Sequence, residues 1–184
     1  MMSKEEIVLK LLTLFRQQGY EGTSLSQISQ VTGLGKASLY HYFPGGKEEM
    51  AQAALNYIEG WLKENILIPL QSNITPQERL QAMCDRVEVF YECGKKSCLW
   101  AVLTLEQSSD RFQIQIKRAL ILWIEALASL LQEAGIEPTE AKFRAEEAIL
   151  RIQGSLILAR GLNDTAPFER TMQRLSQELL KETI

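Results

Sequence analysis

Apolar residues recur at spacings of three and four along most of the chain, and no long stretch alternates apolar with polar positions. This periodicity predicts an all-α protein. Serine, threonine, glycine and proline stand between the apolar stripes, where helices are expected to begin and end. The expected helices lie near residues 4–18, 25–32, 36–42, 46–68, 76–91, 98–106, 112–131, 139–160 and 167–179.

The second and third of these helices are short and follow one another closely. Ser24 with Gln27 is a capping-box pattern, so the first of the pair should begin near Leu25. Gly33 stands where the end of that helix favours a residue that tolerates positive φ. The buried face of this helix is expected to consist of Leu25, Ile28 and Val31.

The second helix of the pair, near residues 36–42, is too short to be stable alone and must pack on its neighbours. Its expected apolar anchors are Ala37, Leu39 and Phe43, which leaves a free face with Lys36, Ser38, Tyr40, His41 and Tyr42. Two short helices joined by a tight turn predict a helix-turn-helix whose second helix enters the DNA major groove. The alternative is an ordinary helical hairpin with a solvated second helix.

The residues around this turn also resemble a known family. The segments 23–25, 33–43 and 47–50, above all Leu39-Tyr40-His41-Tyr42-Phe43 followed by Lys47, are similar to the N-terminal DNA-binding domain of TetR-family regulators. Segment 43–49 together with segment 98–106 is similar to the LmrA- and YxaF-like branch of that family. The resemblance implies a DNA-binding domain at residues 1–47 and an effector-binding and dimerisation domain at residues 48–184.

A helix-turn-helix regulator of this kind is expected to bind double-stranded DNA at a palindromic operator as a homodimer, because one unit touches too few base pairs for useful selectivity. The candidates to meet base edges or nearby phosphates are Lys36, Ala37, Ser38, Tyr40 and His41. The residues expected mainly to hold phosphates are Thr23, Ser24, Tyr42 and Lys47. For Lys47 the alternative is an ordinary solvated lysine.

The charge of the chain is unusual for a DNA-binding protein, since the formal net charge is −3. The first 47 residues, however, carry five basic and three acidic side chains, so the negative balance lies in the remainder. This contrast is too mild to identify the partner. It implies that phosphate contacts depend on helix N-termini and hydroxyls as much as on lysines.

The C-terminal two thirds of the chain contain two helices, near residues 98–106 and 112–131, that are apolar on most faces. Such helices are expected in the centre of a domain. We expect the dimer interface on the last two long helices, near residues 139–160 and 167–179. The first has small residues at close spacing, and the second has a wide apolar side. The alternative is that this face packs inside the monomer.

Large and adaptable side chains, Trp, Phe, Tyr and Met, are frequent in helices that must share one interior. This set favours a site for a small apolar or aromatic effector, in which Gln153 or Thr104 would orient the ligand. The alternative is that the side chains simply fill the core. The candidate residues are Trp61, Met83, Val87, Phe90, Tyr91, Trp100, Leu103, Thr104, Trp123, Gln153 and Phe168.

Other functions fit the residues less well. The single histidine lies in the helix-turn-helix and no nucleophile has an identifiable base, so we do not expect an enzyme. The cysteines do not have zinc-finger spacing, and no metal or cofactor is expected. The chain contains no uninterrupted apolar stretch of about 18 residues and no signal peptide, which predicts a cytoplasmic protein without a membrane span.

Two alternatives to the ligand-responsive regulator stay open. Cys93 and Cys98 are five residues apart, a separation that permits a disulfide, so the switch could be redox-driven. A helical interaction module without DNA binding is the other alternative, and it requires the face around Tyr40 to be idle or to bind protein.

Overall fold

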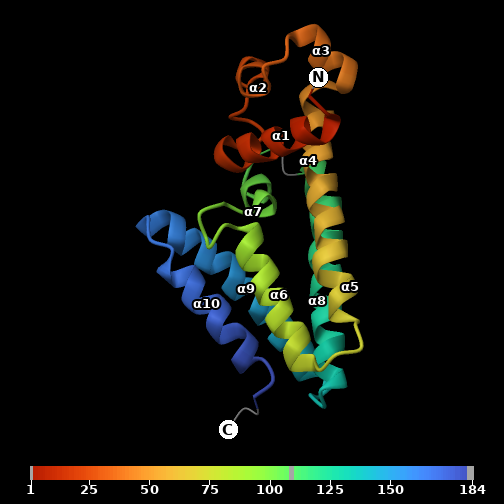
Figure 1. The fold of residues 1–184 in the computed structure, drawn as a ribbon, viewed down its shortest axis with the longest axis vertical. Helices are drawn as coiled ribbons and strands as arrows, with labels where there is room; N and C mark the ends of the chain where they lie inside the picture. Colours follow the sequence, from red (N-terminus) through yellow and green to blue (C-terminus); the bar gives the residue numbers. More distant parts are fainter. Residues whose placement is uncertain (1, 108–109, 182–184) are drawn as a thin grey trace. The chain divides into compact units, whose positions relative to one another are not determined.

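The structure is a computed structural model that describes residues 2–107 and 110–181, and these residues contain helices and no strand (Figure 1). The all-α prediction is confirmed. The elements in chain order are α1 (Lys4–Gln18), α2 (Leu25–Thr32), α3 (Lys36–Tyr42), α4 (Gly46–Leu62), a π-helical stretch (Lys63–Leu67), α5 (Ile68–Leu70), α6 (Pro76–Phe90), α7 (Leu99–Thr104), α8 (Asp110–Glu133), α9 (Pro138–Leu162) and α10 (Ala166–Glu178). None of the described helices is long and apolar enough to cross a lipid bilayer.

Three helices begin at capping boxes, in which the N-cap side chain and the residue three positions later bond to each other's backbone N–H. Ser3 forms one at α1, Ser24 at α2 and Thr75 at α6. At α2 the Gln27 N–H donates to Ser24 Oγ at 3.2 Å, and the Ser24 N–H donates to Gln27 Oε1 at 2.7 Å. These starts agree with the positions predicted from local sequence.

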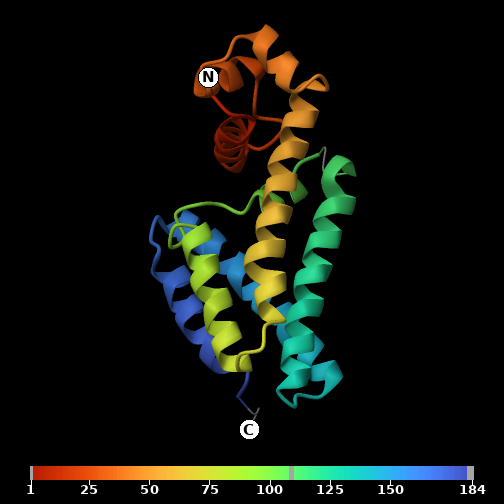
Figure 2. The same cartoon turned by 45° about the vertical axis from the view of Figure 1, so that its right-hand side comes forward.

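The helix expected from residue 46 toward Pro69 is continuous but not uniform. α4 passes without a break into the π-helical stretch and then into the short α5 (Figure 2). The Asn65 side-chain amide donates to the Trp61 carbonyl at 3.0 Å just where the winding changes. π-helical winding is rare and concentrates at functional sites.

By their internal contacts the residues form two compact units. Unit 1 comprises Met1–Gly60 and Cys98–Ile116, and unit 2 comprises Trp61–Ser97 and Lys117–Ile184. α4 and α8 therefore each have residues in both units. This grouping follows packing, whereas the boundary after residue 47 separates expected functions and stays a prediction.

Unit 1 has its core between α1, α2 and the start of α4. The fully buried residues include Ile7, Leu11, Phe15, Ile28 and Leu39. α1 packs against α2, and it also contacts α7, which follows some 80 residues later in the chain. The N-terminal helices therefore share their core with a segment from the middle of the sequence.

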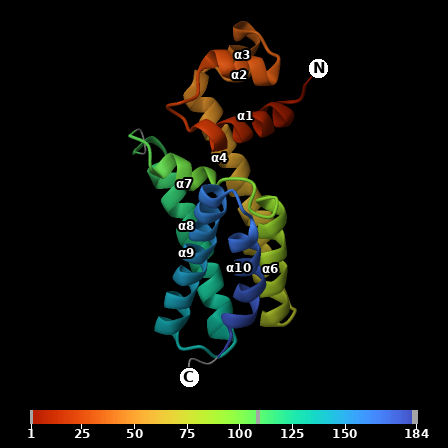
Figure 3. The ribbon, with the colours of Figure 1, turned by 90° about the vertical axis from the view of Figure 1, so that its left-hand side faces the viewer.

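Unit 2 has α10 packed against both α6 and α9, and Figure 3 shows α10 lying between them. The apolar side of α10, with Phe168, Met172 and Leu175, is buried inside this unit. The small residues of α9, such as Ala141 and Ala148, are buried there as well. For these residues the alternative of packing inside the monomer holds, whereas Gly154, another small residue of α9, is exposed. A dimer interface that includes α9 stays a prediction.

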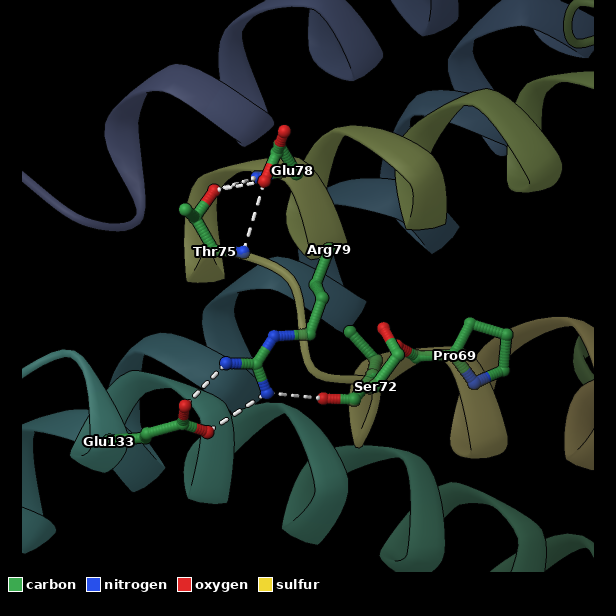
Figure 4. Close-up of polar contacts among 7 residues, drawn as sticks. Pro69, Ser72, Thr75, Glu78, Arg79 and Glu133 are labelled. Carbon is green, nitrogen blue, oxygen red and sulfur yellow. Dashed lines mark hydrogen bonds and ion pairs between the residues drawn. The ribbon is translucent and has the colours of Figure 1, made fainter.

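An ion pair between Arg79 and Glu133 joins the first turns of α6 to the end of α8 (Figure 4). The Arg79 guanidinium, 4% exposed, donates to the two carboxylate oxygens of Glu133 at 2.9 and 2.5 Å and to the Leu70 carbonyl at 3.0 Å. The hydrogen bond from Arg79 holds the pKa of the Glu133 carboxyl below its ordinary value, although that carboxyl is itself largely exposed. Figure 4 also shows the neighbouring Thr75–Glu78 capping box.

α8 differs from its prediction, because it is not buried on all sides. Trp123 and Leu127 are buried, but Ile114 is 84% exposed, Ile121 41% and Leu122 39%. This side of α8 is therefore not covered by another described helix of the monomer, and exposed apolar patches of this kind often mark interaction surfaces.

Candidate nucleic-acid interface and effector region

The turn between α2 and α3 is held by local bonds that define the angle of the helix pair. Gly33 has φ 71° in the left-handed region, and its N–H donates to the Ser29 carbonyl at 2.8 Å. The Ser29 hydroxyl donates to the Leu34 carbonyl at 2.5 Å. α3 has only seven residues, so its position depends on Leu39 and Phe43, both 0% exposed.

The other side of α3 faces solvent. The exposed residues are Lys36, Ala37, Ser38, Tyr40 and His41. Ala37 therefore does not anchor the helix, which corrects one part of the prediction. Val31 on α2, also expected to be buried, is 37% exposed. Tyr42 is half-buried, and its hydroxyl donates to the Met2 carbonyl at 3.3 Å.

A groove of about 530 Å³ lies beside this face in unit 1, and we name it the Tyr40–Lys47 groove. It brings together four of the residues predicted to contact DNA, namely Thr23, Ser24, Tyr40 and Lys47. Its other lining residues are Tyr20, Leu25, Pro44, Gly45, Gly46, Glu48 and Arg111. The groove thus combines two cationic side chains with the first residues of α2 and α4.

Lys47 stabilises the loop that borders this groove. Its ammonium donates to the carbonyls of Tyr20 at 2.8 Å and Thr23 at 3.0 Å, and it lies 4.3 Å from the centroid of the Tyr20 ring. These bonds hold the loop between α1 and α2 against the start of α4. An ammonium has three N–H groups, so two carbonyl bonds leave one for a ligand in the groove.

The two hydroxyl residues before α2 differ in what they can offer to a phosphate. Thr23 is 1% exposed, its hydroxyl donates to the Gly19 carbonyl at 2.6 Å, and its N–H donates to the Tyr20 carbonyl at 3.3 Å. Thr23 thus holds the loop, and both of its donors are already bonded to backbone carbonyls, which corrects its predicted role as a phosphate contact. Ser24 is exposed and caps α2.

Residues far along the chain complete this region, and sequence reasoning did not find them. The Glu106 carboxylate accepts the N–H groups of Tyr20 at 2.9 Å and Glu21 at 3.2 Å. Arg111 forms an ion pair with Glu48, and the Phe112 ring meets the Tyr20 ring edge-on at 5.3 Å. No local pattern signals such contacts, because they join residues about 60 to 90 positions apart.

The predicted effector residues fall into both units. Trp61 stacks on Phe90 with ring centroids 3.9 Å apart, and Tyr91 lies edge-on to Phe168 at 6.2 Å, all in unit 2. Met83, Val87 and Trp123 are buried in the same unit. Trp100, Leu103 and Thr104 instead lie on α7 in unit 1, where the Thr104 hydroxyl donates to the Trp100 carbonyl at 2.7 Å.

Gln153 has the most unusual environment among these residues. Both polar atoms of its side-chain amide are buried, and neither has a hydrogen-bond partner among the residues that the structure describes. A buried amide without a partner is costly, so such groups are rare and call for an explanation by a bound molecule or water.

The cysteines occupy three different settings, and all are free thiols. Burial raises the pKa of the Cys84 thiol to about 12. Cys93 is exposed at a backbone φ of 55°, and Cys98 is buried just before α7. No group of three or more His, Cys, Asp or Glu side chains suited to a metal ion occurs in the described part of the chain.

The fold and the site together define a helix-turn-helix protein with a second, helical unit. Comparison with known proteins agrees. The family described as "Bacterial regulatory proteins, tetR family" matches residues 7–54, and the family "Transcriptional regulator LmrA/YxaF-like, C-terminal domain" matches residues 76–174. The chain belongs to the TetR family, in its LmrA/YxaF-like branch, and is a DNA-binding transcriptional regulator and not an enzyme.

Individual relatives span nearly the whole chain. The HTH-type transcriptional regulator LmrA of Bacillus subtilis (strain 168) is 28% identical over 169 residues, which cover 90% of each protein. The uncharacterized regulator YxaF of the same organism is also 28% identical over 169 residues, covering 90% of this chain and 88% of YxaF. A TetR transcriptional regulator from Legionella pneumophila has the same fold, with a TM-score of 0.83 at 23% identity, covering 96% of this chain and 97% of that one.

Proposed function

We propose that this regulator is a repressor that binds a palindromic operator as a homodimer and is released by a small apolar or aromatic molecule. The observation that carries the DNA-binding geometry is the two-sided character of α3. Leu39 and Phe43 fix the helix from one side, and the opposite side is exposed over its whole length. A DNA-binding role also implies the cytoplasm as its place of action.

We assign the DNA contacts according to this exposure. The residues proposed to meet base edges or nearby phosphates are Lys36, Ala37, Ser38, Tyr40 and His41. Ser24, Tyr42 and Lys47 are proposed to hold phosphates at the edges of the same surface. Lysines and hydroxyls that contact phosphates set affinity and register, while side chains at base edges set the sequence preference.

The surface proposed for self-association is the outward side of α9. Among its exposed apolar residues, Phe143, Leu150 and Ile157 recur every seven positions, and Leu158 and Leu162 follow in the last turns of the helix. Gly154 and Gly161 lie on the same side, and a Cβ placed on either would meet no atom within 4 Å. Two copies of such a face, together with α8, which also exposes the apolar residues Ile121 and Leu122, suit a four-helix interface with two-fold symmetry.

Operator selection from random duplexes tests the DNA-binding proposal. The enriched sequence should be a palindrome whose half-sites lie about one helical turn, ~34–36 Å, apart or a multiple of that distance. Tyr40→Ala should lose preference for the selected sequence over a scrambled duplex. If no sequence is enriched, or if Tyr40→Ala retains wild-type discrimination, the proposal is wrong.

Sedimentation of a Gly154→Arg variant tests the dimer surface. A charged, bulky side chain on this stripe should give monomers that no longer bind the operator. The matched control is Gly60→Arg, because Gly60 is another exposed helical glycine with no atom within 4 Å of a placed Cβ. A dimeric Gly154→Arg variant would overturn this placement.

The effector part of the proposal is supported by Gln153. Its buried amide offers a donor and an acceptor, while unit 2 supplies buried aromatic and aliphatic groups such as Trp123 and Phe168. A flat ligand that carries one polar group would bury its rings and satisfy the amide. An apolar ligand without such a group would leave the amide unsatisfied.

Binding of 2-naphthol and naphthalene, followed by tryptophan fluorescence and by release of operator DNA, tests this role. Wild-type protein should prefer 2-naphthol by about fivefold to tenfold, the worth of one net hydrogen bond. Gln153→Leu should lose that preference without losing stability, since it removes an unsatisfied polar group. A Cys93→Ser/Cys98→Ser variant should respond as wild type does. If it loses all response, the switch is redox-driven.

A further inference from the structure

Arg111 is the one cationic residue of the Tyr40–Lys47 groove that comes from outside the helix-turn-helix and the start of α4. It lies in the first turn of α8, within the segment Cys98–Ile116 that packs into unit 1. We propose that Arg111 is a further DNA-contacting residue, whose guanidinium exchanges Glu48 for a backbone phosphate when the operator is bound. This inference rests on the proposed operator binding.

The position of Arg111 in the groove is held by two neighbours. Its guanidinium carbon lies 5.9 Å from the centroid of the Tyr20 ring, and one N–H pairs with a Glu48 carboxylate oxygen. Tyr20 is also the residue whose carbonyl and ring receive Lys47. Arg111 and Lys47 therefore converge on the same tyrosine and line the same groove.

The pair with Glu48 is of a kind that exchanges easily. The Arg111 side chain is 48% exposed and the Glu48 side chain 56% exposed, so both charges are well solvated and their pairing contributes little to stability. A phosphate with two available oxygens can accept both N–H groups of a guanidinium edge, which makes a stronger and more directional contact. DNA in the groove would thus outcompete Glu48 for Arg111.

Two further carboxylates near this edge, those of Glu106 and Glu49, are held by backbone N–H groups. The Glu106 carboxylate accepts the N–H groups of Tyr20 at 2.9 Å and Glu21 at 3.2 Å. Glu49 is held by the backbone, because its carboxylate accepts the Gly45 N–H at 2.7 Å. Among the groove residues Lys47 and Arg111 are positive and Glu48 is negative, so the lining has a net positive charge. That sign suits a phosphate.

This contact would connect DNA binding with unit 2 through one continuous helix. α8 contains Arg111 in its first turn and continues into the residues of unit 2, including the buried Trp123. A change in unit 2 that shifts the first turn of α8 would withdraw one phosphate contact from the operator complex.

The salt dependence of operator affinity tests the proposal. Each phosphate neutralised contributes a slope of about 0.9 to the fall of log K with log salt concentration. Arg111→Gln should therefore reduce the slope by about one, and Arg111→Lys should keep the slope at lower affinity. The matched control is Lys117→Gln, which removes the same charge from an exposed position on α8 outside the groove and should leave the slope unchanged.

A double-mutant cycle with Glu48→Gln tests the exchange itself. Releasing Arg111 from Glu48 should strengthen operator binding about threefold in the wild-type background, and most of this gain should vanish in Arg111→Gln. An equal gain in both backgrounds, or an unchanged salt slope in Arg111→Gln, overturns the proposal while wild-type operator binding stands. If the wild-type protein selects no operator, the proposed function fails and this inference fails with it.

Discussion

The contact between Glu106 and the loop after α1 should contribute measurably to the free energy of unfolding. The Glu106 carboxylate accepts two backbone N–H groups, from Tyr20 at 2.9 Å and from Glu21 at 3.2 Å. Gly19, directly before them, has φ 74° and ψ −180°, a backbone conformation that residues other than glycine rarely adopt. A Cβ placed on Gly19 would lie 1.9 Å from Glu106 Oε1, so Gly19→Ala must displace the carboxylate.

The expected magnitudes follow from these contacts. Two hydrogen bonds to a charged acceptor, partly open to solvent, contribute about 1–3 kcal/mol together, which is the expected loss in Glu106→Ala. Gly19→Ala loses the same bonds and adds about 1–3 kcal/mol of backbone strain. Because the alanine has already displaced Glu106, the double variant should be no less stable than Gly19→Ala alone.

Urea unfolding, followed by far-ultraviolet circular dichroism, gives the free energy of unfolding of wild type, Gly19→Ala, Glu106→Ala and the double variant from their midpoints and slopes. The difference between the double variant and the sum of the single variants measures the coupling between Gly19 and Glu106. The matched control is Gly33→Ala, since Gly33 has a similar φ of 71° but no atom within 4 Å of a placed Cβ. Its effect of about 1 kcal/mol should add to that of Glu106→Ala. If the stability losses of Gly19→Ala and Glu106→Ala also add in the double variant, the two residues do not share the contact and the reasoning is refuted.

Three further predictions concern unit 2. Gly94→Ala should lower the urea midpoint by more than Gly33→Ala does, because Gly94 has φ 92° and a Cβ there would lie 2.9 Å from the Phe168 Cβ; equal losses would contradict the clash. Since pairing with Arg79 lowers the folded-state pKa of Glu133, its stabilisation should be complete above the ordinary carboxyl pKa and be lost as pH falls through the lower folded value. Melting temperatures of Glu133→Gln between pH 3 and 6 should accordingly vary less than those of wild type. Cys84, whose pKa burial raises to about 12, should react with iodoacetamide only after unfolding, as peptide mapping would show.

Helix positions were readable from the sequence because their signals are local. The capping boxes at Ser3, Ser24 and Thr75 join residues three positions apart, so the pattern of residue types already contains both partners. α3 was expected at residues 36–42 and is found at Lys36–Tyr42. The identity of the family was readable for a similar reason, since its motif lies in one short contiguous stretch.

The side of each helix that is buried was less predictable. The sequence assigned α9, for its small residues, and α10, for its wide apolar side, to a dimer interface. Packing against α6 and α9 buries that side of α10, whereas the stripe of α9 around Leu150 and Ile157 stays exposed. Apolar periodicity shows that a helix has an apolar face, but the neighbour that covers the face is chosen by packing of the whole unit.

The candidate site shows the same division between local and tertiary information. The exposed residues of α3, such as Tyr40 and His41, were found from the helix-turn-helix pattern. Arg111 and Glu106 were not, because their partners Glu48 and Tyr20 lie about 60 and 90 residues away and no periodicity relates them. Only the folded chain, which packs Cys98–Ile116 with the N-terminal helices, places those charges beside the loop and groove.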